Sequence, residues 1–182
     1  MIQYLHSLAK PVHRIIGEHD AATAYIFSLD FSSILMVKKR FSGRLMPPGG
    51  HVDEGESYYE AVLREIHEES NINTSLLKKV QLFQIPQRVP GEFEVMPAKS
   101  DEEFVVKEVI TPIHFHLDHI YCFQYPEKFK RRQINNTEIK EVLWVDVNTI
   151  QKKDLYPNVY RTIMHFYSKG ITNYGLQGKT VD

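Results

Sequence analysis

A glycine-rich loop followed by an acidic helix, between residues 50 and 72, constrains the fold of this chain more than any other segment. Ser57 and Glu60 have the spacing of a capping box, in which each side chain accepts a hydrogen bond from the other residue's backbone. Asn71 stands where the helix should end, and asparagine is the next-best residue after glycine for a left-handed C-cap. The apolar residues at helical spacing, which predict a buried stripe, are Tyr59, Val62, Leu63 and Ile66. We therefore predict a helix over residues 57–70 that packs one face on a core.

Three glutamates, Glu65, Glu68 and Glu69, share one side of this helix, because residues three and four apart are neighbours. Like charges at that spacing cost about 0.2–0.5 kcal/mol per pair. No lysine stands at helical spacing to relieve the repulsion, and Arg64 is the nearest cation in the sequence. A divalent cation would relieve it, and carboxylate oxygens suit Mg²⁺ or Mn²⁺. An isolated acidic face is more often simply solvated, so the metal interpretation depends on the Gly-Gly turn and Glu56 that precede the helix at fixed spacing.

The overall composition indicates one globular domain over residues 1–182. Apolar residues make up 42% and charged residues 25%, which excludes a mostly disordered chain. The formal net charge of −1 gives no bulk attraction to DNA, RNA or an anionic membrane. Cys122 is the single cysteine, so no internal disulfide is expected. With no signal-peptide pattern and no run of about 20 apolar residues, a cytoplasmic protein is the default expectation.

Hydrophobic patterning predicts strands mixed with helices, which is typical of an α/β or α+β domain. Strands are predicted at residues 21–28, 34–37, 80–85, 113–124 and 142–147, and helices at 2–16, 57–70 and 156–168. Residues 43–55 are predicted to form a loop. Residues 86–112 are predicted to be a long polar connection, which in a compact domain is often a binding loop or lid.

The segment 50–72 resembles the signature of the Nudix hydrolase family of MutT-like pyrophosphohydrolases, G-x5-E-x7-R-E-U-x-E-E-x-G-U, where U is a bulky aliphatic residue. The matching residues are Gly50, Glu56, Arg64, Glu65, Ile66, Glu68, Glu69 and Ile72. Asn71 replaces the last glycine of the pattern, which is a mild change for a left-handed cap. The resemblance covers roughly residues 20–147, because residues 45–50 look like the turn before the signature, and Glu138, Glu141 and Trp144 look like the family's C-terminal strand. It implies the Nudix fold, an α/β/α sandwich around a mixed β-sheet.

The resemblance also implies an activity, the Mg²⁺-dependent or Mn²⁺-dependent hydrolysis of a nucleoside diphosphate linked to another group. Carried over by position, the metal ligands would be Glu65, Glu68 and Glu69 with the Gly50 carbonyl. Arg64 would orient the carboxylates, and Glu56 would brace the loop. Metal ions would neutralise the diphosphate and lower the pKa of the attacking water. A carboxylate would then take the proton; either Glu69 or Glu138 could do so, and the family varies on this point.

Two basic clusters have both a functional and a plain interpretation. Lys38, Lys39, Arg40 and Arg44 precede the Gly-Gly turn, where Lys39 and Arg44 could bind substrate phosphates, or the cluster could be a solvated hairpin. The second cluster could face RNA, since basic residues beside an aromatic suit single-stranded nucleic acid. Its residues are Lys128, Phe129, Lys130, Arg131 and Arg132. The cluster is short and the net charge nearly neutral, which favours a solvated loop.

His114, His116 and Asp118 alternate along a predicted strand and would therefore share one face. They could contact a ligand or substrate, with His116 the candidate substrate contact, although satisfied polar residues on a half-exposed strand are more common. The His-x-His-x-Asp pattern resembles a recurring feature of one group of Nudix proteins, which also carry a stretch similar to residues 19–24 here. That group does not point to one substrate.

Other features bear weakly on the substrate. Pro86 fits the position of a proline in ADP-ribose-cleaving Nudix enzymes, but one proline is weak evidence. Four aromatic residues could stack on a base, although each is more often plain core; they are Tyr25, Phe27, Phe83 and Phe123.

The alternatives to a small-molecule nucleotide hydrolase are a Nudix-fold binding or sensor module without turnover, and a Nudix enzyme that processes RNA 5′ ends. The expected partner is a small nucleotide-type substrate, with no DNA or membrane partner. Many family members are dimers, so a homodimer is a further possibility.

Overall fold

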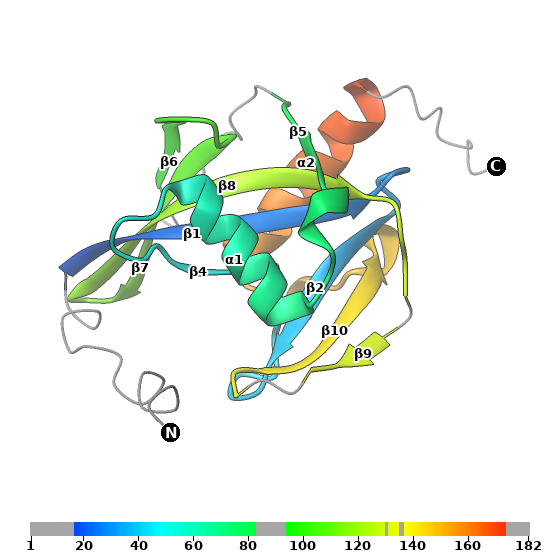
Figure 1. Ribbon diagram of the computed structural model, residues 1–182, viewed down its shortest axis with the longest axis horizontal. Helices are drawn as coiled ribbons and strands as arrows, with labels where there is room; N and C mark the ends of the chain where they lie inside the picture. The colour runs from blue at the N-terminus through cyan, green and yellow to red at the C-terminus, as the bar shows by residue number, and fades with distance from the viewer. Residues whose placement is uncertain (1–16, 83–93, 130, 135–136, 174–182) are drawn as a thin grey trace.

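The computed structural model describes residues 17–82, 94–129, 131–134 and 137–173. The predicted helix at 2–16, together with Phe83, Pro86 and Lys130, lies outside this part of the chain. A mixed β-sheet forms the centre of the molecule, with helix α1 in front of it and helix α2 behind it in Figure 1. The predicted α/β/α sandwich is therefore confirmed.

The strands are β1 (Gly17–Ser28), β2 (Ser33–Lys39), β3 (Leu45–Met46), β4 (Gly49–His51), β5 (Lys78–Val80), β6 (Glu94–Pro97), β7 (Phe104–Thr111), β8 (His114–Tyr125), β9 (Arg131–Gln133) and β10 (Ile139–Asp146). The main strand order is β6-β7-β8-β1-β2-β10-β9, with β3 on β2, β4 on β1 and β5 on β8. The long strands β1 and β8 run parallel, with His19 opposite His116, whereas the other pairs are antiparallel.

Helix α1 (Tyr58–Ser70) begins and ends as its sequence predicts. The Ser57 hydroxyl accepts a hydrogen bond from the Glu60 N–H at 3.2 Å, and the Ser57 N–H donates to the Glu60 carboxylate at 2.8 Å. Asn71 has the left-handed conformation, with φ of 51°. Val62 and Ile66 are fully buried against the sheet, so the predicted stripe does face a core.

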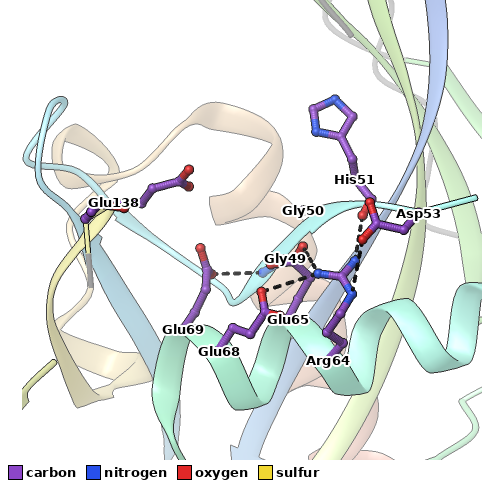
Figure 2. Close-up of a pocket in the computed structure, with 10 residues that line it drawn as sticks. Gly49, Gly50, His51, Asp53, Arg64, Glu65, Glu68, Glu69 and Glu138 are labelled. Atoms are coloured by element: carbon purple, nitrogen blue, oxygen red, sulfur yellow. Dashed lines mark hydrogen bonds and ion pairs between the residues drawn. The ribbon is translucent and has the colours of Figure 1, made fainter. Parts of the chain in front are cut away.

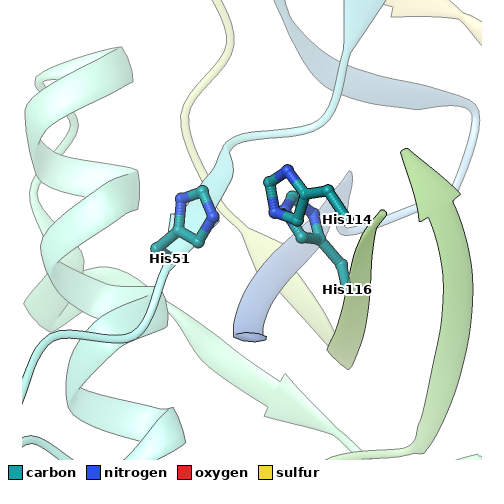
Figure 3. Close-up of side chains that lie close together, drawn as sticks. All are labelled: His51, His114 and His116. Atoms are coloured by element: carbon teal, nitrogen blue, oxygen red, sulfur yellow. The ribbon is translucent and has the colours of Figure 1, made fainter. Parts of the chain in front are cut away.

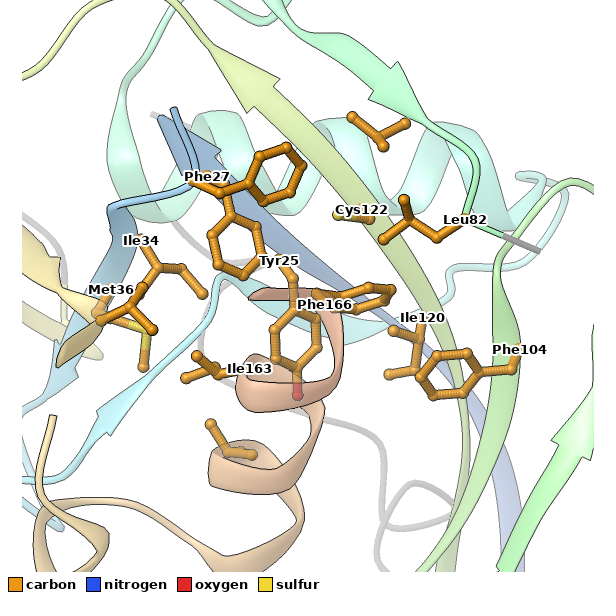
Figure 4. Packing of buried hydrophobic residues seen from close by; sticks show 14 of the residues in the cluster. Tyr25, Phe27, Ile34, Met36, Leu82, Phe104, Ile120, Cys122, Ile163 and Phe166 are labelled. Atoms are coloured by element: carbon orange, nitrogen blue, oxygen red, sulfur yellow. The ribbon is translucent and has the colours of Figure 1, made fainter. Parts of the chain in front are cut away.

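Helix α2 (Pro157–Asn173) covers the opposite face of the sheet. It begins with a proline, whose fixed φ suits the first helical position, and continues five residues beyond the predicted end. Ile163 and Phe166 of α2 pack against Tyr25 and Phe27 of β1 and Phe104 of β7 (Figure 4). The two helices thus bury two separate cores, one on each face of the sheet.

The predicted long connection at 86–112 is wrong for its described part. Residues 94–111 contain β6 and β7, which form an antiparallel pair at one edge of the sheet. Phe104, Val105 and Val106 are buried. This half of β7 pairs with β8 within the sheet, and Phe104 and Val106 pack in the core beneath α2. The charged residues and prolines around this short apolar run concealed the strand in the sequence.

Candidate functional site

A cavity of about 300 Å³ opens between strand β4 and helix α1 (Figure 2). It is lined by Gly49, Gly50, His51, Asp53, Arg64, Glu65, Glu68, Glu69, Thr137 and Glu138. The cavity therefore brings together Glu65, Glu68 and Glu69, the three acidic residues that the sequence predicted as metal ligands. Their helical spacing places them on one side of α1, facing strand β4.

Glu65 is held tightly beneath strand β4. Its carboxylate lies so close to Gly50 that a Cβ at that glycine would stand 2.4 Å from Oε1. Arg64 donates a hydrogen bond to the same oxygen at 2.7 Å. Burial raises the pKa of Glu65 in spite of Arg64, and the nearby Glu69 and Glu68 carboxylates raise it further. The environment of Glu65 thus favours either a proton or an added cation.

Glu69 is the most buried of the predicted ligands Glu65, Glu68 and Glu69, with a side chain that is 5% exposed. One carboxylate oxygen accepts a hydrogen bond from the Gly49 N–H at 3.1 Å, and the other pairs with the Lys39 ammonium. Burial raises the pKa of Glu69, although Lys39 opposes the shift. The sequence did not indicate this partner, because Lys39 comes from β2 and meets the helix only through the fold.

Arg64 connects the helix to the loop that precedes it. Its guanidinium binds both oxygens of Glu56, at 2.7 and 3.1 Å, and donates to the His51 carbonyl at 2.9 Å. Glu56 in turn accepts a hydrogen bond from the Asp53 N–H at 2.6 Å. Hydrogen bonding to Arg64 is the main reason that the pKa of Glu56 is lowered. These contacts give Arg64 and Glu56 the geometry of positioning residues.

Glu68 and Glu138 complete the acidic wall of the cavity. The Glu68 side chain is 54% exposed and lies 3.4 Å from Arg64. Glu138 comes from the segment before β10, and Figure 2 shows its side chain across the cavity from Glu69. Its charge contributes to the raised pKa of Glu69.

The basic residues before the Gly-Gly turn diverge in the structure. Lys38 pairs with Glu141 at 3.7 Å, and Lys39 pairs with Glu69. The Arg44 guanidinium lies 4.3 Å from the centre of the Tyr156 ring, at the edge of a second cavity. The substrate contacts predicted for Lys39 and Arg44 remain predictions.

The second cavity, of about 540 Å³, lies between the sheet and the start of α2. Its lining residues are Thr23, Tyr25, Met46, Pro47, Glu108, Val109, Ile110, Asp118, Tyr156, Pro157, Asn158 and Val159. Of the described aromatic residues predicted to stack on a base, Tyr25 lines this cavity, whereas Phe27 and Phe123 are buried in the two cores.

Asp118 is an unusual residue for such an apolar cavity. One oxygen accepts a hydrogen bond from the Thr23 hydroxyl at 2.9 Å. The other, Oδ1, is buried and has no hydrogen-bond partner among the described residues. Burial raises the pKa of Asp118 well above its usual range, and the nearby Glu108 raises it further. The surroundings of Asp118 therefore favour the protonated form of its carboxyl group.

His114 and His116 share one face of β8, as predicted, and meet His51 from β4 (Figure 3). The Nε2 atoms of His114 and His116 lie 3.0 Å apart. Burial, and next the nearby imidazoles, lower the pKa of His116 to about 4. The sequence placed His51 in the glycine-rich loop but gave no sign that it would join the other two.

The second basic cluster is engaged in local contacts where it is described. Arg131 pairs with Glu141 at 3.1 Å, and Arg132 lies 3.9 Å from the centre of the Phe129 ring. Lys128 lies 3.5 Å from Asp30. This arrangement favours the interpretation as a solvated surface segment, although Arg131 and Arg132 belong to the exposed edge strand β9 and not to a loop.

A family model described as the NUDIX domain matches residues 17–166, which is most of the chain. The chain belongs to the Nudix family. A Bacillus subtilis (strain 168) protein, provisionally named an 8-oxo-dGTP diphosphatase, is 42% identical over 65 residues. That match spans 35% of this chain and 44% of the relative.

Solved Nudix-fold structures agree over nearly their whole length. A C. elegans Ap4A hydrolase in a binary complex superimposes with a TM-score of 0.57 and 19% identity, over 82% of this chain and 96% of that one. The E. coli dihydroneopterin triphosphate pyrophosphohydrolase superimposes with a TM-score of 0.56 and 19% identity, over 82% and 94%. At these identities the likeness establishes the fold. Within the described residues, neither helix combines the length and apolar character that a bilayer span requires.

Proposed function

We propose that this Nudix protein is a Mg²⁺-dependent pyrophosphohydrolase that cleaves the diphosphate bridge of a nucleotide or nucleotide derivative. The observation that carries the proposal is the pair of buried carboxylates, Glu65 and Glu69, packed under the glycines of β4. Burial raises the pKa of both groups, so both would gain from a bound cation. Carboxylate and carbonyl oxygens are the donors that Mg²⁺ or Mn²⁺ prefers.

The residues that would hold Mg²⁺ are Glu65, Glu68 and Glu69, with the Gly50 carbonyl. When bound, the ion would neutralise the diphosphate and lower the pKa of the attacking water. Arg64, through its hydrogen bond to Glu65 and its contact with Glu68, would keep both carboxylates oriented toward the cavity. Glu56 would hold Arg64 in place through its two hydrogen bonds.

The proton of the attacking water would pass to Glu69 or Glu138. Both groups line the cavity, and their mutual repulsion favours a proton on one of them. Glu138→Gln distinguishes the two. Loss of kcat in that variant with Mg²⁺ binding retained would identify Glu138 as the base. An unchanged kcat would point to Glu69, whose own substitution would lower Mg²⁺ affinity as well, because Glu69 is a proposed ligand.

We place the nucleoside portion of the substrate in the second cavity. Its volume falls in the range of about 300–1,000 Å³ that is usual for small-ligand sites, and its walls are mostly apolar. Tyr25 and Tyr156 supply aromatic rings, and the Asp118 carboxyl, when protonated, could donate a hydrogen bond to a base. The proteins named above act, by their names, on nucleoside or pterin phosphates, which supports this substrate class.

The experiment is product release from a substrate panel with Mg²⁺ and with Mn²⁺. The panel comprises ADP-ribose, dinucleoside polyphosphates, nucleotide sugars, and normal and oxidised nucleoside triphosphates. Glu68→Gln should abolish most metal-dependent hydrolysis and leave the fold intact, whereas Glu54→Gln, an exposed acid of the same loop, should behave as the wild type. Unchanged turnover in Glu68→Gln would refute the metal site. Tight Mg²⁺ binding without turnover of any compound would favour a binding module instead.

A further inference from the structure

Three imidazoles converge beside the acidic cavity, from strands that are far apart in the sequence. His51 comes from β4, and His114 and His116 come from β8 (Figure 3). One ring nitrogen of each lies within 4.8 Å of the others. His114 is buried, and His51 and His116 are half-buried. The cluster is therefore mostly shielded from solvent.

Strand β1 makes this convergence possible. It lies between β4 and β8, with Ala21 opposite His51 on one side and His19 opposite His116 on the other. Gly17 of β1 is the partner of His114. Ala21 and Gly17 carry little or no side chain, which leaves room above β1 for the imidazoles from the flanking strands. His19, between them on the same face, adds its own ring, whose centroid lies 5.2 Å from that of His114 and 6.0 Å from that of His51. The small residues in β1 are thus part of the geometry.

The donor chemistry differs from that of the acidic cavity. Imidazole nitrogen is a ligand for Zn²⁺, Cu²⁺, Ni²⁺ or Fe²⁺, whereas Mg²⁺ prefers oxygen. Three histidines with an open fourth position form a common zinc arrangement. With Zn–N distances of about 2.0–2.1 Å, tetrahedral ligand nitrogens lie about 3.4 Å apart. The 3.0 Å between the Nε2 atoms of His114 and His116 is close to this value, and the ligand nitrogens of all three histidines lie within 4.8 Å of one another.

We propose that His51, His114 and His116 bind one transition-metal ion of the Zn²⁺ class through three ring nitrogens. The site is separate from the carboxylate site in its donors but connected to it through the backbone. The His51 carbonyl accepts the hydrogen bond of Arg64, and His51 also lines the acidic cavity. An ion in the histidine site would therefore lie next to the proposed diphosphate site without sharing the glutamates.

The test is Co²⁺ and Zn²⁺ binding to the chelator-treated protein, with Mg²⁺ in excess to fill the carboxylate site. We expect one Co²⁺ per chain, a visible absorption band typical of nitrogen ligands, and loss of that band when one equivalent of Zn²⁺ is added. His116→Gln and His114→Gln should each lose the band. His67→Gln, an exposed histidine of α1 outside the cluster, should keep it. Glu68→Gln should also keep it.

Two results would overturn the proposal. One is the failure of the wild type to bind Co²⁺ or Zn²⁺ stoichiometrically in Mg²⁺. The other is a band that survives both histidine substitutions but disappears in Glu68→Gln, which would place the ion among the carboxylates. Far-UV circular dichroism of every variant shows whether a lost band reflects a lost ligand or an unfolded chain. If one histidine variant does not fold, His51→Gln takes its place. None of these readouts depends on hydrolysis, so the result is independent of the proposed function.

Discussion

Replacing Lys39 with methionine tests whether this lysine takes the place of a cation at the acidic cavity. Methionine keeps the length and the apolar stem of lysine but removes the ammonium group. The Lys39 side chain is 22% exposed and its partner Glu69 only 5% exposed, so the pair is largely withdrawn from water. After the substitution, Glu69 keeps the hydrogen bond from the Gly49 N–H but loses its positive neighbour.

The expected cost follows from this burial. Removing one partner of a buried ion pair destabilises a protein by about 3–5 kcal/mol. Lys39 is partly exposed and Glu69 retains one hydrogen bond, so we expect about 3 kcal/mol in metal-free protein at neutral pH. For a chain of this size that corresponds to a fall in Tm of about 6–12 °C. The pKa of Glu69, already raised by burial, should rise further, so the folded state would hold a proton that the unfolded state releases. The cost should therefore grow as the pH rises and shrink as it falls.

Mg²⁺ should reverse much of this loss. A ligand at 100 times its Kd stabilises the folded state by about 2.7 kcal/mol. Because the ammonium would no longer repel the ion or occupy Glu69, Mg²⁺ should stabilise Lys39→Met more than the wild type. Urea unfolding with and without Mg²⁺ measures both effects.

Lys38→Met is the matched control for this experiment. Lys38 is 36% exposed and lies 3.7 Å from Glu141, which also pairs with Arg131. Its loss should cost no more than about 1 kcal/mol, and its response to Mg²⁺ should equal that of the wild type. If the two variants are equally stable without metal, or gain equally from Mg²⁺, then Lys39 does not stand in for a cation.

Three further predictions concern other parts of the molecule. The lysine in Arg64→Lys cannot form the two hydrogen bonds that Arg64 makes with Glu56. We therefore expect a loss of about 2 kcal/mol in the free energy of unfolding and a fall in kcat with any active substrate. Wild-type values for both would contradict the positioning role of Arg64. Gly170→Ala would place a Cβ 2.4 Å from the Phe31 ring, so thermal unfolding should show a loss of about 1–3 kcal/mol, and an unchanged Tm would show that α2 can shift. The pKa of His116 is lowered to about 4, so between about pH 6.5 and 4 the unfolded state binds a proton that the folded state does not. Stability of the metal-free protein should therefore fall across that window as the pH is lowered, by about 2 kcal/mol after allowance for partial exposure, and His116→Gln should flatten the slope in urea titrations at successive pH values.

Structural features that depend on residues close together in the chain were predictable from the sequence. The capping box of Ser57 and Glu60, the left-handed Asn71 and the glutamates on one side of α1 all depend on contacts within a few residues. For these elements, local spacing was enough to fix the geometry. The roles of Arg64 and Glu56 came from the family resemblance, and their pairing with each other, across eight residues, was not predicted.

Contacts made by the tertiary fold were not predictable in this way. Lys39 contacts Glu69 only because the fold brings β2 beneath the end of α1. His51 contacts His114 only because β1 pairs with β4 on one side and with β8 on the other. The sequence did not predict strand β7, which begins at Phe104. Its outer half, which includes Val109 and Ile110, is exposed, and the residues that flank the strand are charged. The periodicity of one segment does not carry information about which distant segment will lie beside it.

Strand β4 shows how three residues can connect these separate features. A Cβ at Gly49 would stand 2.6 Å from the Thr23 hydroxyl, and one at Gly50 would stand 2.4 Å from the Glu65 carboxylate, so both glycines are required by close approach. Gly49 lines the acidic cavity and touches Thr23, which lines the second cavity and binds Asp118. His51 follows directly, with its carbonyl bound to Arg64 and its ring in the histidine cluster. A movement of this strand would therefore alter the proposed diphosphate site, the proposed nucleoside site and the proposed zinc site together, because the same short segment forms a wall of the first and contacts or contributes residues to the other two.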